Sequence, residues 1–77
     1  MDINIFIEQF ADLFDETDAS EIQASTPFRD LNEFSSLIAL SFISMVQEEY
    51  DVLLDGDEIR SAVTVEDLFN LVKSKLD

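Results

Sequence analysis

Apolar residues recur every three or four positions through the first 14 residues of the chain. This spacing lines one face of an α-helix, because the helix repeats every 3.6 residues. Acidic and polar side chains take most of the remaining positions. The pattern predicts an amphipathic helix that begins at Ile3 and buries Ile3, Phe6, Ile7, Phe10, Leu13 and Phe14.

The helical period is lost between residues 17 and 30, where Thr, Ser, Asp and Pro27 are frequent. This composition is typical of a long surface connection. Ile22 and Phe28 are its large apolar residues, and we expect them to anchor the connection to the core.

A second helical period starts near residue 35 and runs to about Tyr50, and Asp51 ends it. Serine is a preferred N-cap, so either Ser35 or Ser36 can cap this helix. With Ser41 placed toward water, the predicted core face comprises Ala39, Phe42, Ile43, Val46 and Tyr50. Four apolar residues fall on its flanks, and the first and last of them are expected to be partly exposed: Leu37, Ile38, Leu40 and Met45.

Two further helices are predicted in the last third of the chain. Asp55-Gly56-Asp57 is a turn signal that could also cap a short helix over residues 58–60. Thr64 can cap a final helix, which carries acidic residues in its first turn and lysines near its end. One face of this helix comprises Val65, Leu68, Phe69, Val72 and Leu76. Because no segment has the alternation of a strand, the sequence predicts an all-α fold.

The composition narrows the function. The 77 residues provide for one small domain over residues 1–77, with 18 acidic and 4 basic side chains and a net charge of −14. The absence of cysteine and histidine excludes disulfides, cysteine nucleophiles and histidine-based catalysis. The negative charge disfavours nucleic acid and anionic membrane surfaces as partners and favours proteins with basic surfaces. No secretory signal or transmembrane segment is visible, so we expect a cytoplasmic protein, with a monomer as the default state.

No catalytic residue or metal site is expected. The segment from Asp51 to Asp57 superficially resembles a calcium loop, but Leu53 and Ala62 occupy positions that must supply oxygen ligands. The adjacent Glu48 and Glu49 point apart on a helix, and the chain offers no cleft that would tune them for acid–base work.

Ser36 is the candidate modification site. A serine without a neighbouring base is a poor nucleophile within its own protein. A phosphate attached at a helix N-terminus is nevertheless stabilised by unpaired N–H groups and by the positive end of the helix dipole. Ser36 could therefore accept a phosphate-linked group from another enzyme, or it could serve only as a cap.

The second predicted helix also carries a candidate docking surface. Leu37 and Met45 are apolar residues expected near its exposed side, and Glu48 and Glu49 add negative charge. Such a surface suits a partner with an apolar groove and a basic edge.

Three motifs in order resemble the acyl carrier protein family. They are F-R-D-L-N-E-F-S-S-L at residues 28–37, E-E-Y-D at 48–51 and T-V-E-D-L at 64–68. The family pattern has an F-x-D-L approach, an Asp-Ser-Leu start and an acidic end of the second helix, and a T-V-x-D-L-like opening of the last helix. The resemblance covers nearly the whole chain, with Ser35 standing where the family usually has aspartate.

The resemblance implies a four-helix bundle with three longer helices and a short third helix. It also implies that a separate phosphopantetheinyl transferase attaches 4′-phosphopantetheine from coenzyme A to Ser36, and that the terminal thiol holds acyl groups as thioesters. The carrier itself would catalyse nothing. Its second helix would dock on acyl-loading and acyl-processing enzymes of fatty-acid synthesis or of a specialised pathway, through Leu37, Met45, Glu48 and Glu49. Two alternatives remain open: an unmodified interaction module of the same fold, and a carrier of aminoacyl or peptidyl groups.

Overall fold

The first helix, α1, spans Ile3–Ala11 in the computed structural model, which describes residues 1–76. Asp2 caps it, because its Oδ1 accepts a hydrogen bond from the amide of Asn4 at 2.8 Å. The helix ends before Leu13 and Phe14, but both side chains still pack against the core. The predicted apolar face is therefore confirmed, although it extends beyond the helix itself.

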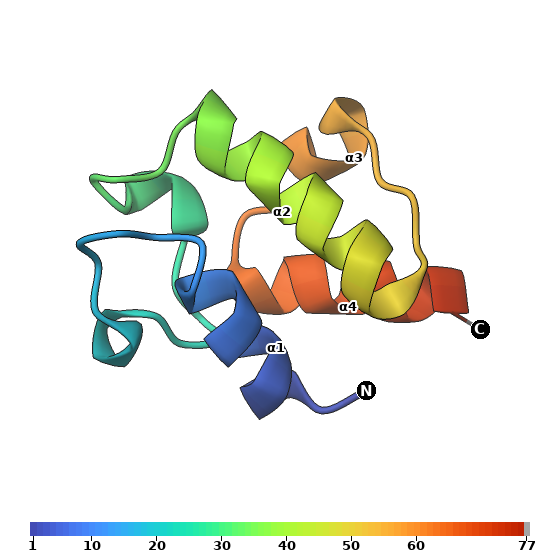
Figure 1. Cartoon of the computed structure of the whole chain (residues 1–77), viewed down its shortest axis with the longest axis horizontal. Helices are drawn as coiled ribbons and strands as arrows, with labels where there is room; N and C mark the ends of the chain where they lie inside the picture. Colours follow the sequence, from blue (N-terminus) through green and yellow to red (C-terminus); the bar gives the residue numbers. More distant parts are fainter. Residues whose placement is uncertain (77) are drawn as a thin grey trace.

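The connection between α1 and α2 wraps around one side of the molecule (Figure 1) and contains two short 3₁₀ turns, η1 (Ala19–Glu21) and η2 (Phe28–Asp30). Ile22 and Phe28 are both buried, as the sequence predicts. An isolated backbone bridge between Pro27 and Thr64 ties the connection to the segment that precedes α4.

Glu33 fastens the beginning of this connection to its end. Its carboxylate accepts hydrogen bonds from the amides of Asp15 at 2.7 Å, Glu16 at 3.0 Å and Thr17 at 2.9 Å. The Thr17 hydroxyl donates a further bond at 2.8 Å. One side chain therefore satisfies three consecutive backbone donors of the loop that follows α1.

The hydrogen bonds of the Glu33 carboxylate are expected to weaken in acid. Burial by itself raises the pKa of Glu33, but the donors from Glu16, Asp15 and Thr17 outweigh burial and hold the pKa below the usual 4.5. The stabilisation is present above pH 4.5 and is lost as the pH falls through the lowered pKa. We expect Glu33→Gln to lower the urea midpoint at pH 7 relative to the unsubstituted chain, and the difference to shrink below pH 4.5. Glu16→Gln removes the same charge from the same loop and is the control. A difference in urea midpoint between Glu33→Gln and the unsubstituted chain that is constant with pH would contradict a stabilising role of the Glu33 carboxylate.

The second helix, α2, spans Ser36–Tyr50 and ends at Asp51, which adopts the left-handed conformation with φ 55°. Its buried residues are Ile38, Phe42 and Val46. The predicted core face is confirmed for Phe42 and Val46. It is wrong in omitting Ile38, and the buried face is rotated toward that residue, since Ala39, Ile43 and Tyr50 are only partly buried. Phe42 sets this orientation because its ring packs edge-on against Phe6 and Phe10 of α1. Leu37 is exposed over 72% of its surface, as the sequence predicts, and the rotation leaves Leu40 62% exposed as well.

The last two helices follow the predicted caps. The short α3 spans Gly56–Arg60 and is capped by Asp55, and α4 spans Val65–Leu76. Thr64 Oγ1 accepts a hydrogen bond from the amide of Asp67 at 3.1 Å, as expected of an N-cap. Four of the five predicted apolar residues of α4 are buried, but Leu76 is exposed because it lies in the last turn of the helix.

A connected cluster of aromatic rings holds the bundle together. All seven phenylalanines belong to it through edge-on pairs, and they come from every long helix and from the connection. The rings fill the interior between α1, α2 and α4, while α3 lies beside the N-terminal half of α2 (Figure 1). The observed architecture confirms the predicted all-α fold with three longer helices and a short third helix, and residues 1–76 contain no strand.

Candidate functional site

The first turn of α2 presents two serines in different roles. Ser35 is the N-cap, and its Oγ accepts a hydrogen bond from the amide of Ile38 at 3.4 Å. Ser36 is the first residue of the helix and is exposed. Its hydroxyl makes no hydrogen bond with any residue that the structure describes, nor do the amides of Ser36 and Leu37 find an acceptor in that part of the chain. Ser36 thus combines a free hydroxyl with backbone donors at the positive end of a helix.

Ser36 stands at the edge of a groove of about 440 Å³ between α2 and α3. Apolar side chains form most of the lining, with Phe34 from the approach to α2 and Ile59 from α3 among them. Arg29 and Arg60 add positive charge to the same groove. The sequence analysis missed both arginines, because nothing in their local sequence shows that they converge on Ser36.

Arg29 ties the end of α3 to the η2 turn. Its two terminal nitrogens donate to the carbonyls of Ala62 at 2.6 Å and Ile59 at 2.8 Å, at the end of α3. Its guanidinium also lies over the ring of Phe28, with 4.7 Å from Cζ to the ring centroid. These contacts give the carbonyls at the end of α3 charged donors, so Arg29 has a structural role in shaping the groove.

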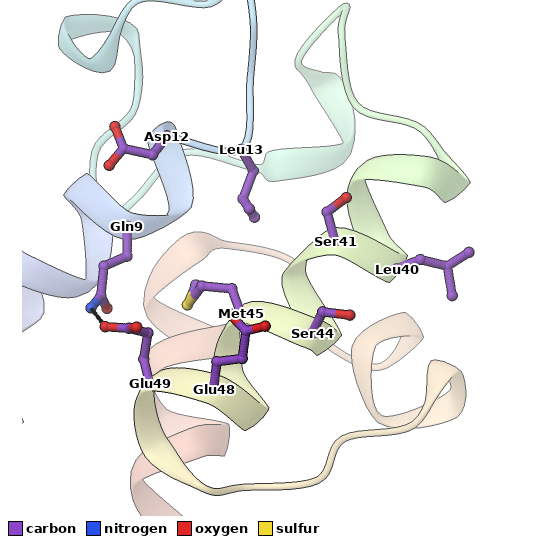
Figure 2. A pocket seen from close by; sticks show the side chains of 9 residues that line it. All are labelled: Gln9, Asp12, Leu13, Leu40, Ser41, Ser44, Met45, Glu48 and Glu49. Atoms are coloured by element: carbon purple, nitrogen blue, oxygen red, sulfur yellow. Dashed lines mark hydrogen bonds between the residues drawn. The ribbon is translucent and has the colours of Figure 1, made fainter.

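A second groove, of about 590 Å³, lies between α1 and α2 (Figure 2). It brings together three of the four predicted docking residues, Met45, Glu48 and Glu49, but not Leu37, which is exposed elsewhere on α2. Figure 2 shows Leu13 and Met45 pointing into the space between the helices, whereas Leu40 points away from it. The sequence did not identify the contribution of α1 to this surface, which consists of Gln9, Asp12 and the adjoining Leu13.

Gln9 joins the two helices at one end of this groove. Its Nε2 donates to Glu49 Oε1 at 3.2 Å, drawn as a dashed line in Figure 2, and its Oε1 accepts a hydrogen bond from the Tyr50 hydroxyl. Burial and the nearby charge of Glu49 raise the pKa of Tyr50, so the hydroxyl remains a donor at neutral pH. The amide of Gln9 therefore holds the C-terminal end of α2 against α1.

A four-helix bundle with an exposed, unengaged serine at the start of its second helix has the architecture of a carrier domain. The family model described as "Phosphopantetheine attachment site" matches residues 4–72, and the chain belongs to this family. No curated protein and no solved structure matches the chain. Domains of this family carry covalently attached 4′-phosphopantetheine, interact with phosphopantetheinyl transferases and acyl-processing enzymes, and are generally not catalysts.

The first turn of α2 fits such a group. The hydroxyl of Ser36 is accessible for a phosphodiester bond, the free amides of Ser36 and Leu37 can donate to phosphate oxygens, and Arg60 lies on the same groove. When bound, the group supplies a thiol on a flexible arm, which can hold a cargo group as a thioester. None of the helices over residues 1–76 is long and apolar enough to cross a membrane.

Proposed function

We propose that this chain is an acyl carrier, a single domain over residues 1–77 that carries 4′-phosphopantetheine on Ser36. The observation that supports Ser36 most directly is the division of labour between the two serines. Ser35 supplies the cap of α2, which leaves the exposed Ser36 hydroxyl free to be modified. In this proposal the carrier has no catalytic residue of its own.

The residues around Ser36 then have defined tasks. A transferase would take the proton of the Ser36 hydroxyl while Oγ bonds to phosphorus and the nucleotide part of coenzyme A leaves. The amides of Ser36 and Leu37 would hold the resulting negative charge at the helix N-terminus. Tethering raises the effective concentration of a thioester at each docked enzyme, so weak and rapidly reversible docking is sufficient.

Loading and peptide mapping test the proposal. The full chain is incubated with coenzyme A and a phosphopantetheinyl transferase of broad specificity, and its intact mass is measured. We expect a gain of one phosphopantetheine group, which fragmentation assigns to Ser36. An unchanged mass would favour the unmodified interaction module, and assignment to Ser35 would overturn the site. Acyl and aminoacyl donors offered to the loaded chain then decide between an acyl and an aminoacyl carrier.

The proposed docking surface comprises Leu37, Met45, Glu48 and Glu49 on α2. Glu48 and Glu49 are exposed, Met45 is partly buried and Leu37 is 72% exposed, so the surface combines accessible apolar atoms with negative charge. Its partners would be the transferase and acyl-loading or acyl-processing enzymes with basic docking surfaces, in fatty-acid synthesis or a specialised acyl pathway. The net charge of −14 supports protein partners over nucleic acid.

Charge reversal tests this surface. We expect Glu48→Lys to raise the KM of the transferase for the carrier by about fivefold, equivalent to about 1 kcal/mol, with little change in kcat. Glu8→Lys makes the same change of net charge on the exposed surface of α1 and is the matched control. Equal effects of the two substitutions would show that only the overall charge of the carrier matters.

A further inference from the structure

Positive charge is concentrated beside Ser36. Only 4 of the 77 residues are basic, yet Arg29 and Arg60 both line the groove between α2 and α3, together with Ser36. No acidic residue is among the described residues that line this groove. The groove between α1 and α2 has the opposite character, with three carboxylates and no cation among its described lining residues. The two sides of α2 therefore differ in the charge they offer to an anion at Ser36.

Arg60 is the less firmly held of the two cations that line this groove. Arg29 is held by two backbone carbonyls and by the ring of Phe28. The two lysines are on α4, and Lys75 forms an ion pair with Glu58 at 2.6 Å. Arg60 contacts only Asp57 among the described ion pairs, one turn earlier on α3, and its side chain is 73% exposed.

The contact between Arg60 and Asp57 is easily exchanged. Both side chains are largely exposed, and such pairs contribute little to stability because water screens them. A guanidinium binds phosphate oxygens through parallel N–H groups in a stronger, charge-assisted geometry. A phosphodiester on Ser36 would also add negative charge to a chain that already carries −14, which favours its neutralisation by an exposed cation that lines the same groove.

We propose that Arg60 binds the phosphodiester that joins the arm to Ser36, and that it gives up its contact with Asp57 to do so. This inference rests on the proposed attachment at Ser36. Arg60 then acts as a positioning residue, because it holds the phosphate end of the arm on the α3 side of Ser36. The arm therefore starts away from the groove between α1 and α2, where Glu48 and Glu49 are proposed to meet partner enzymes.

The experiment compares the unloaded and loaded chain by NMR. The chain has two arginines, so two Nε–Hε resonances are observed and Arg60→Gln assigns them. Intact mass first establishes loading. We expect loading to shift the Arg60 resonance but not that of Arg29. We also expect the ³¹P resonance of the arm to differ between the loaded unsubstituted chain and loaded Arg60→Gln, and high salt to reduce this difference.

Two control variants distinguish the loss of a positive charge anywhere on the chain from the loss of Arg60 itself. Lys73→Gln removes the same charge from α4 and is expected to leave the ³¹P resonance unchanged, whereas Arg60→Lys is expected to restore it in part. Normal loading with unshifted Arg60 and ³¹P resonances would overturn the role of Arg60 and leave the carrier function intact. Equal ³¹P shifts in Lys73→Gln and Arg60→Gln would also overturn it. Failure of every chain to gain mass would overturn the carrier function and this inference together.

Discussion

The Ser36→Ala variant is expected to gain no phosphopantetheine while remaining as stable as the unsubstituted chain. The substitution removes the only hydroxyl that the proposal allows the transferase to use. Ser36 is exposed, and its hydroxyl makes no hydrogen bond with a described residue, so its loss costs the fold little. We expect the free energy of unfolding to change by less than about 0.5 kcal/mol. Intact mass after loading and urea denaturation measure the two properties.

Ser35→Ala should show the opposite behaviour. It removes the hydroxyl that caps α2, so the variant should lose about 0.5–1 kcal/mol of stability, near the lower end for an N-cap because the hydrogen bond to Ile38 is long. It keeps Ser36 and should still be loaded. A chain that loads equally well with alanine at position 36 would overturn the proposed site, and the pair of variants shows whether lost loading results from lost folding.

The roles of these two serines could be predicted from the sequence only in part. Capping preference restricts the start of α2 to Ser35 or Ser36, but it cannot choose between them, because either hydroxyl has the required chemistry. The backbone decides: Ser35 is extended, with φ −153°, and Ser36 begins the helix. Only this geometry shows which hydroxyl is engaged and which is free.

The position of each long helix could be predicted from the sequence, but the rotation of α2 about its own axis could not. Caps and periodicity are local, so the positions of α1, α2 and α4 follow from residues near each helix. The rotation of α2 depends on Phe42 meeting Phe6 and Phe10 across the bundle, which no local pattern contains. Ser41 does not fix this rotation, because Ser41 is only partly exposed and the neighbouring Leu40 is 62% exposed.

Tertiary placement also explains what the sequence missed in the grooves. Arg29 and Arg60 are 31 positions apart, and they share a groove only because the carbonyls at the end of α3 are bound by Arg29. Likewise, Gln9 reaches Glu49 only because the fold brings this part of α1 to the C-terminal end of α2. The net charge of −14 does not show that two of the four basic residues lie on the groove beside Ser36.

Phe10→Ala is expected to be strongly destabilising. Phe10 has no exposed surface, and its ring packs edge-on against Phe14, Phe28 and Phe42, with centroids 5.3, 6.4 and 5.6 Å away. The loss of these contacts and the resulting cavity should cost about 3–5 kcal/mol. A domain of this length has about 4–12 kcal/mol in total, so this one substitution should remove at least about a quarter of it.

Equilibrium urea denaturation measures the effect, and Ile5→Ala provides the control on the same helix. Ile5 is 51% exposed, so its truncation should change stability by less than about 0.5 kcal/mol. Phe10→Leu keeps most of the buried volume and should lose clearly less than Phe10→Ala. Equal costs for Phe10→Ala and Ile5→Ala would mean that the aromatic cluster does not hold α1 against α2. Because the same cluster fixes the rotation of α2, that result would also remove the basis for placing Leu37 and Leu40 on its exposed side.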